Sequence, residues 1–206
     1  LPDPRMFGPL VKIPVKLPTG ISGFDTKDQE VVFGPTEATG EQVAALEKQL
    51  DIALKIRDDI SRLAEAVNRI RSVRKQLSDR SELLKDDEKA VALIKDSKSF
   101  IEKLDALEAK LHNPKAEVTY DILGDKRGAQ LYSKLSALFD WIKDGDGAPT
   151  QGWRDEYAEQ RKELQKYLDE FKGLVTGDLA KLNDAAKKLE VPTVFVPGEK
   201  ESPKKP

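Results

Sequence analysis

The chain has 206 residues, of which 35% are charged and 6% are aromatic, and this length suits one domain with appended segments. Its 35 basic and 37 acidic side chains leave a net charge of -2, which excludes a global electrostatic attraction to nucleic acid or to a membrane surface. The lack of cysteine excludes disulfides, thiolate catalysis and cysteine-ligated metals, and no apolar run approaches the ~20 residues of a membrane-spanning helix.

Residues 1–38 are rich in proline and glycine, and we expect them to form an extended strap or linker with short strands. Two segments, 10–17 and 30–33, have β-type patterns, and the proline within the first limits it to an edge strand or a strap. The chain starts without an initiator methionine and without a signal-peptide pattern. We therefore expect a processed product or a piece of a larger polypeptide.

A long helix is predicted to begin at residue 39, where Thr39 and Gln42 form a capping box. Up to residue 77 it contains no proline, and at 1.5 Å per residue it would span ~55 Å. Apolar residues alternate at spacings of three and four, which is typical of helices packed at a shallow angle. The members of this predicted seam are Leu46, Ala53, Ile56, Ile60, Leu63, Val67, Ile70 and Leu77.

Charged pairs four residues apart are expected on the face opposite this seam, where each adds ~0.2–0.5 kcal/mol. The predicted pairs are Asp51 with Lys55, Asp58 with Arg62, and Glu65 with Arg69.

Three further helices are predicted, at about 86–111, from Asp125 to Ile142, and over 150–189, each with an apolar face. Thr150 is the expected N-cap of the last, and two glycines, Gly173 and Gly177, weaken it enough to favour a bend. The fold class expected is all-α, an antiparallel four-helix bundle over 39–191 with the N-terminal strap. The remainder, 192–206, should be a short extended segment beside that strap, followed by a disordered tail.

Candidate chemistry is scarce. His112, the single histidine, lies at a predicted helix end, where an imidazolium would interact favourably with the helix dipole, and one histidine cannot form a multi-histidine zinc site. The loop 144–149 lacks the ligand spacing of an EF-hand. Catalytic motifs and a set of nucleophile, base and orienting residue are also missing. The sequence therefore predicts no enzyme, with no catalytic, cofactor-binding or metal-binding residue.

Two groups of residues are candidates for a ligand or partner surface. Arg69, Arg71 and Arg74 form a basic stretch whose positions are scattered around the helix, which favours ordinary solvated charge over a patch for phosphate or an acidic partner. Trp141, Trp153 and Tyr157 flank a glycine-rich turn, where aromatic side chains either cap the core or form a stacking platform for a glycan or a peptide.

Four segments carry a family resemblance: Asp3-Pro4-Arg5, the helix 49–58 with its continuation 68–71, the stretch 134–138 leading to 146–150, and 179–183. Together they resemble the C-terminal helical region of bacterial secreted proteins with sortilin-like, Asp-box (BNR) β-propeller repeats, often labelled glycosyl hydrolases. The strap at 6–38 is longer than in that family, and the chain has no Asp-box. Any sugar-processing activity that the resemblance implies would belong to the propeller, which is absent from this chain.

The leading hypothesis is a non-catalytic structural or protein-interaction module, periplasmic or secreted. Its partner would be the propeller of the same precursor or other subunits of an assembly, with no nucleic acid and no membrane span. The alternative is a glycan-binding or glycan-processing accessory that uses the aromatic bundle end. A third possibility is a coiled-coil homodimer in which the long helix pairs with its own copy.

Overall fold

The computed structural model describes residues 11–15, 29–33, 40–113, 128–145 and 147–198, in two compact units, Leu1–Val43 and Ala44–Pro206. In the first unit, strands β1 (Val11–Val15) and β2 (Gln29–Phe33) pair antiparallel, with Val11 opposite Phe33. These strands coincide with the two extended segments predicted from the sequence. The predicted capping residue Thr39 and the tail 199–206 lie outside the described residues.

The second unit is an all-α helical bundle, as predicted. The order of elements is α1 (Gly40–Leu83), the short 3₁₀-helix η2 (Glu88–Ala90), α2 (Val91–Leu111), α3 (Leu131–Lys143), α4 (Gln151–Leu174), the π-helical turn η4 (Val175–Leu179) and α5 (Ala180–Lys188). At 1.5 Å per residue, the 44 residues of α1 span about 66 Å. The four predicted long helices are all present, and none of the helices in the described ranges is long and apolar enough to cross a membrane.

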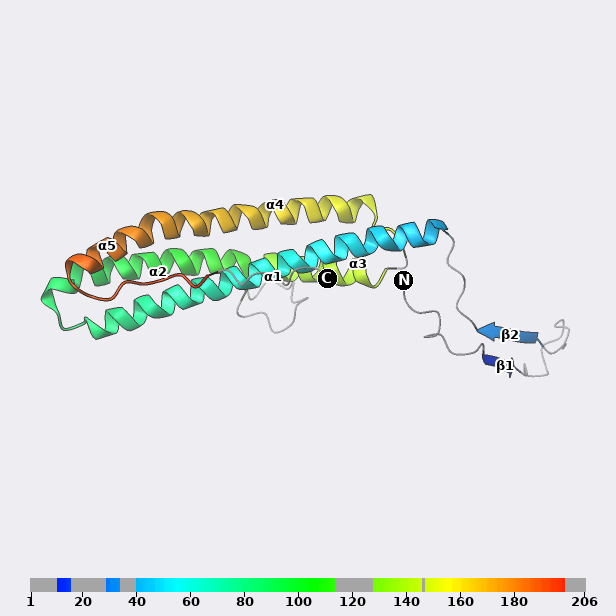
Figure 1. The fold of residues 1–206 in the computed structure, drawn as a ribbon, viewed down its shortest axis with the longest axis horizontal. Coiled ribbons are helices and arrows are strands. Elements are labelled where there is room, and N and C mark those ends of the chain that lie inside the picture. The colour runs from blue at the N-terminus through cyan, green and yellow to red at the C-terminus, as the bar shows by residue number, and fades with distance from the viewer. Residues whose placement is uncertain (1–10, 16–28, 34–39, 114–127, 146, 199–206) are drawn as a thin grey trace. The chain divides into compact units, whose positions relative to one another are not determined.

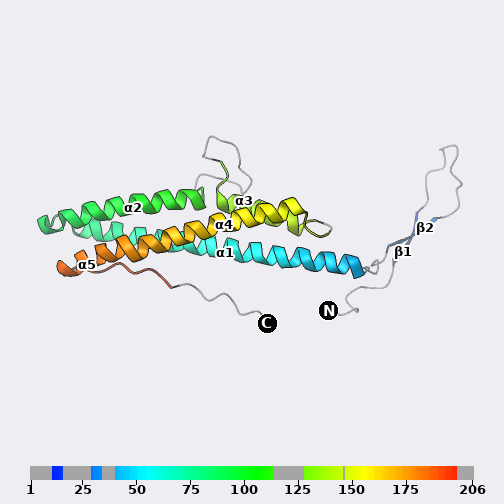
Figure 2. The ribbon, with the colours of Figure 1, turned by 90° about the horizontal axis from the view of Figure 1, so that it is seen from above.

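The helices run in rows along the bundle (Figures 1 and 2). After α1, the chain reverses into α2, and α3 then continues in the same direction as α2, so that the two share one row. The chain reverses again into α4, η4 and α5, which form another row antiparallel to α2 and α3. Because α2 and α3 lie end to end, the long helix α1 contacts both of them.

The core confirms the heptad-like seam of α1. Side chains seven residues apart are almost completely buried, namely Ile56, Leu63, Ile70 and Leu77. This spacing keeps one face of a helix against its neighbours. Leu46, predicted to extend the same seam, is 49% exposed, so that part of the prediction is wrong. At this end of α1 the buried position is Gln49, seven residues before Ile56.

The predicted weak point of the last helix contains the π-helical turn η4, which includes Gly177. Such turns carry one more residue than an α-helical turn and bend the rod that contains them, and the rod changes direction where α4 gives way to α5 in Figure 1. At the other end of α4, the Thr150 side chain accepts a hydrogen bond from the Trp153 backbone at 3.3 Å. This confirms the predicted N-cap.

Helix α5 ends in a Schellman motif. The Val191 N–H donates to the carbonyl of Ala186 at 3.0 Å, the Glu190 N–H donates to that of Lys187 at 3.1 Å, and Glu190 has a left-handed φ of 57°. This reversal sends the following segment, 192–198, back along the bundle (Figure 2). Within the second unit, Gln76 of α1 and Asn183 of α5 bind this segment. Its expected position beside the N-terminal strap stays a prediction.

Candidate functional site

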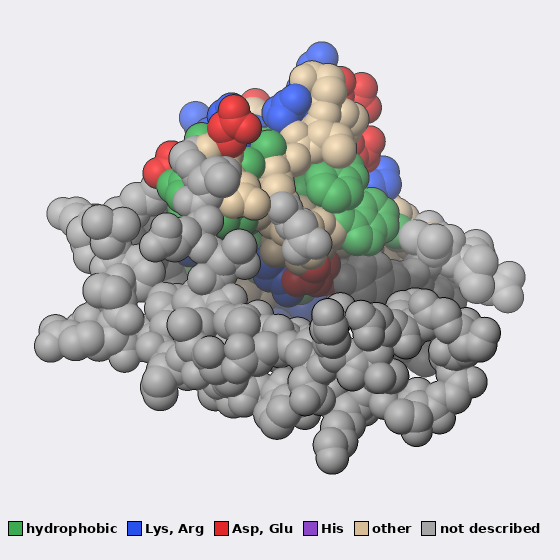
Figure 3. All heavy atoms as spheres, turned by 90° about the vertical axis from the view of Figure 1, so that its right-hand side faces the viewer, with side chains coloured by type: hydrophobic (Ala, Val, Ile, Leu, Met, Phe, Trp, Pro, Cys, Tyr) green, Lys and Arg blue, Asp and Glu red, His purple; other side chains and the backbone are tan. Residues whose placement is uncertain are grey.

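The predicted aromatic end divides into three different environments. Trp141 on α3 is 56% exposed, whereas Trp153 on α4 is partly buried against the core and Tyr157, one turn later, is buried. Gly145 lies between the backbone carbonyl of Trp141 and the Trp153 ring, since a Cβ at Gly145 would lie 3.4 Å and 3.7 Å from them. Hydrophobic side chains are visible among charged ones on this side of the bundle (Figure 3). Of the three predicted residues, only Trp141 presents most of its surface to a ligand.

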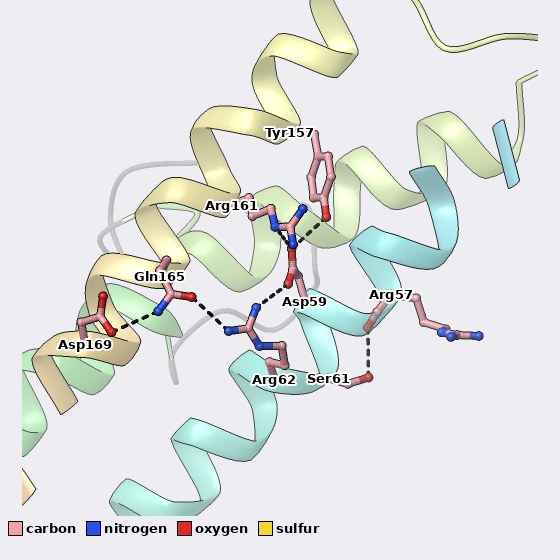
Figure 4. A network of polar contacts seen from close by, with 8 residues as sticks. All are labelled: Arg57, Asp59, Ser61, Arg62, Tyr157, Arg161, Gln165 and Asp169. Carbon is pink, nitrogen blue, oxygen red and sulfur yellow. Dashed lines mark hydrogen bonds and ion pairs between the residues drawn. The ribbon is translucent and has the colours of Figure 1, made fainter. Parts of the chain in front are cut away.

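A buried carboxylate on α1, that of Asp59, is the hydrogen-bond partner of the buried Tyr157 hydroxyl (Figure 4). The Tyr157 hydroxyl donates to Oδ2 of Asp59 at 2.8 Å, and Asp59 is 3% exposed. Burial, together with the adjacent Asp59 carboxylate, raises the pKa of Tyr157 well above its ordinary value, because both disfavour the phenolate. Tyr157 is therefore a protonated hydrogen-bond donor at neutral pH.

Two arginines balance the Asp59 charge. Arg62 Nη1 donates to Oδ1 at 3.0 Å, and Arg161 Nε on α4 lies 3.6 Å from Oδ2. The network continues along α4, where Arg62 Nη2 donates to Gln165 and the Gln165 amide donates to Asp169, each at 3.1 Å. Both oxygens of the Asp59 carboxylate are thus bound to side chains that join α1 to α4, which leaves Asp59 poorly suited to act as a general base.

The charged pairs predicted on α1 are only partly observed. Asp51 pairs with Lys55 at 2.6 Å, as expected. Asp58 pairs with Arg57 instead of Arg62, because Arg62 turns to the buried Asp59. Sequence spacing did not identify Asp59, since two adjacent aspartates offer equivalent partners three and four residues before the same arginine.

The predicted basic residues make contacts within the bundle. Arg71 Nε donates to Glu108 Oε1 at 2.7 Å, and Arg74 Nη1 donates to Glu108 Oε2 at 3.2 Å and to Asp105 at 2.6 Å. The hydrogen bond with Asp105 is the main cause that raises the pKa of Arg74. The Glu108 side chain on α2 is buried. Both arginines therefore join α1 to α2.

Arg69 faces a different neighbour, because its guanidinium carbon lies 5.6 Å from the centre of the Phe171 ring on α4. The scattering of these basic residues around α1 thus corresponds to separate contacts with separate helices. Whether any of them also meets a partner remains a prediction.

His112 ends α2 as its C-cap residue, and its ring forms a T-shaped pair with that of Tyr132, with 5.6 Å between the ring centres. Desolvation lowers the pKa of His112, and the Arg71 charge lowers it further. These effects favour the neutral imidazole at pH 7, in contrast to the imidazolium expected from the helix dipole. In the described ranges, no group of three or more histidines and carboxylates could hold a metal ion.

A hollow of about 210 Å³ lies between α2 and the π-helical turn with α5. Lys103 on one side donates to Asp178 on the other at 2.6 Å, and this hydrogen bond lowers the pKa of the Asp178 carboxyl. The hollow is thus crossed by a satisfied ion pair, which stabilises the contact between α2 and the bent helix.

Comparison with protein-family models, with curated proteins and with solved structures finds no match to this chain. The structure is an all-α helical bundle in which the buried carboxylates Asp59 and Glu108 are each paired with arginines.

Proposed function

We propose that the chain is a non-catalytic helical module that docks onto a partner protein. The partner would be a β-propeller of the same precursor or another subunit of a larger assembly, in the periplasm or outside the cell. The partner class and the compartment follow from the resemblance to the helical region of Asp-box proteins. The docking surface follows from the bundle itself.

The observation that carries this proposal is an apolar row near the start of α1. Leu46 and Leu50 are 49% and 59% exposed, and Val43 precedes them on the same row. Spacings of three and four residues place these side chains on one side of the helix. Helices in bundles normally turn such rows toward a neighbour, and exposed contiguous apolar surface is typical of protein-interaction sites.

The engagement of the titratable groups supports a non-catalytic role. A general acid or base has to reach a substrate and to carry a perturbed pKa. The two buried carboxylates described above, Asp59 and Glu108, each contact two arginines. They act as links between helices.

The proposal is tested with the variant Leu46→Glu/Leu50→Glu. We expect the unaltered chain purified from its native source to elute together with a partner, and the purified partner to rebind recombinant chain but not this variant. Ala44→Glu/Lys48→Glu is the matched control, because it also adds two carboxylates at exposed positions of α1. A native chain that is always a solitary monomer, or a variant that rebinds like the control, would contradict the proposal. Light scattering separates a hetero-complex from pairing of two copies.

The exposed indole of Trp141 favours a second candidate, a glycan-binding accessory, because sugar rings stack on exposed aromatic faces. Trp141→Ala is the informative variant, since Trp153 packs against the core and its removal would also disturb the bundle. Quenching of tryptophan fluorescence by a glycan panel, lost in Trp141→Ala, would support this candidate. Unchanged emission across the panel would exclude it.

A further inference from the structure

The C-terminal segment 192–196 is hydrogen-bonded to α1 and α5. The surface beneath it, formed by Gln76, Arg80 and Asn183, is called the groove below. After the Schellman motif the chain runs back beside α1 in extended form (Figures 1 and 2). Val194 is buried and Val196 packs partly against the core, whereas Phe195 between them is exposed. This alternation is that of a β-strand with one face buried, although the two neighbours of the segment are helices.

Two side-chain amides form the backbone hydrogen bonds that neighbouring strands would form with such a segment in a sheet. On α5, Asn183 accepts a hydrogen bond from the Val194 N–H and donates one to the Val194 carbonyl, both at 2.8 Å. On α1, Gln76 does the same for Phe195, at 3.1 Å and 2.9 Å. The groove therefore binds the backbone of two successive residues from opposite sides, and this recognition is independent of their side chains.

A buried arginine completes the groove. Arg80 on α1 is 6% exposed; it donates from Nη2 to the Ser97 hydroxyl at 3.2 Å and from Nη1 to the Pro192 carbonyl at 3.3 Å. Among the described residues no carboxylate pairs with this guanidinium, and its Nε, also buried, has no hydrogen-bond partner. A buried charge is costly unless it is paired, and the segment offers it only a neutral carbonyl.

We propose that this groove is a binding site for an extended acidic peptide segment of a partner protein, and that residues 192–196 occupy it in the isolated chain. The ligand would carry a carboxylate side chain at the position of Pro192, next to the backbone carbonyl that Arg80 contacts, and a β-branched apolar residue at the position of Val194. Backbone hydrogen bonds to Asn183 and Gln76 would supply affinity, as in peptides that add a strand to a sheet edge.

The resident segment is suited to displacement. Its one buried side chain is Val194, and the segment belongs to no helix or strand of the described ranges, so that its release does not require any of these elements to unwind. An acidic competitor would offer the guanidinium a carboxylate in addition to a backbone carbonyl, and such a charge-assisted hydrogen bond is shorter than a neutral one and about twice as strong. The groove is distinct from the apolar row at Leu46 and Leu50, because 26 residues of α1 separate Leu50 from Gln76, or about 39 Å. This inference therefore does not depend on the function proposed above.

The direct test uses the full chain with Val194→Gly, which weakens the resident segment and leaves the groove residues unchanged. Two labelled peptides copy residues 190–198, one with Pro192→Asp and one with Pro192→Asn, which has a similar shape and no charge. By fluorescence anisotropy we expect the Asp peptide to bind about tenfold more tightly than the Asn peptide. We expect both to bind the unaltered chain more weakly, because its own segment competes.

Two variants of the groove serve as controls in the same Val194→Gly chain. Asn183→Ala should weaken both peptides equally, because it removes backbone contacts, whereas Arg80→Met should abolish the difference between them. Failure of both peptides to bind the Val194→Gly chain would overturn the groove as a peptide site. Equal affinities for the two peptides, or a preference for Asn, would overturn the acidic ligand.

A second measurement does not depend on the folding of Arg80→Met. The substitutions Pro192→Asp and Pro192→Asn are made in the otherwise unaltered full chain, and the Asp chain should have the higher melting temperature at pH 7. A carboxylate paired with Arg80 has a depressed pKa in the folded state, so its contribution is present above the ordinary carboxyl pKa of ~4 and is lost as the pH falls below it. A difference that is absent at pH 7, or that persists unchanged in acid, would contradict the pairing.

Discussion

The side-chain amide of Gln49, near the start of α1, donates a hydrogen bond to the backbone carbonyl of Ile142, near the end of α3, at 2.5 Å. The same nitrogen donates to the carbonyl of Gly145 at 2.6 Å. The last carbonyls of a helix have no partner within the helix, and Gln49 supplies one from a residue 93 positions away in sequence. Gln49 is buried, so water cannot easily replace it.

Gln49→Ala should lower the free energy of unfolding by about 1–3 kcal/mol, because it removes a buried donor from the carbonyls of Ile142 and Gly145. Urea denaturation followed by circular dichroism measures the change. Lys48→Ala, at the neighbouring exposed position, is the control and should stay within about 0.5 kcal/mol of the unaltered chain. Equal stability of the two variants would show that the Gln49 contact does not hold α3 in place.

Asp59→Ala should lower the free energy of unfolding by about 1–3 kcal/mol, since it leaves the buried Tyr157 hydroxyl without an acceptor. Asp58→Ala is its matched control: Asp58 is exposed and pairs only with the adjacent Arg57 among the described contacts, and exposed pairs contribute little. A double-mutant cycle with Tyr157→Phe should give a coupling of about 0.5–3 kcal/mol. Additive effects would contradict a direct bond between the two side chains.

The single histidine gives a selective probe of the contact between α1 and α2. Desolvation, followed by the Arg71 charge, lowers the pKa of His112, so an NMR titration should place it below the ordinary 6.5. Arg71→Gln should move the pKa of His112 upward. A pKa at or above 6.5 in the unaltered chain, or one that Arg71→Gln does not move, would contradict the arrangement.

The lowered pKa also predicts the direction of the pH dependence of stability. Because the folded state binds the His112 proton more weakly than the unfolded state, the contribution of neutral His112 is present above pH 6.5. It is lost as the pH falls from 6.5 toward the lowered folded pKa. His112→Asn should flatten this part of the stability profile, measured by urea denaturation at pH values between 5 and 7. An unchanged slope would contradict the prediction.

Glu190→Gly should raise the free energy of unfolding by about 0.5–1 kcal/mol. Glu190 has a left-handed φ at the position of the Schellman motif that glycine usually occupies, and its Cβ makes this conformation costly. The gain is partly offset by the greater freedom of glycine in the unfolded chain. Glu190→Ala keeps the Cβ and should give no comparable gain, and thermal unfolding compares the two. A similar increase in stability in Glu190→Gly and Glu190→Ala would show that the loss of the Glu190 charge, and not the left-handed φ, causes the effect.

Periodicity predicted the helical bundle because burial of an apolar row every seven residues is a local property of the chain. The extent of each partner helix is not local, and for this reason the same periodicity also predicts burial at Leu46, which is 49% exposed in the part of the chain that the structure describes. The same limit applied to the arrangement of α2 and α3. Two consecutive helices that run in the same direction and two that run antiparallel have the same apolar patterns, so the pattern alone does not decide the direction.

The polar contacts were harder to predict than the core. Gln49, Gln76 and Asn183 are ordinary polar residues in helical sequence, and each acts on a backbone group far away in the chain or on another element. Amides of this kind produce no periodic signal. The sequence does not distinguish Asp59 from its neighbour Asp58, since only the position of α4 decides which of the two adjacent carboxylates is buried. A search for polar residues on the apolar rows would have indicated Gln49, which lies seven residues before Ile56.

The unbroken course of α1 past the junction between α2 and α3 has a mechanical consequence. Helix α2 ends at Leu111 and α3 begins at Leu131, whereas α1 continues past this junction without interruption. A change of angle between α2 and α3 would therefore require α1, which contacts both, to bend. Because α1 is one continuous helix, it keeps Leu50 and Gln76 at a constant separation. A single binding protein that touched both would have to match that length.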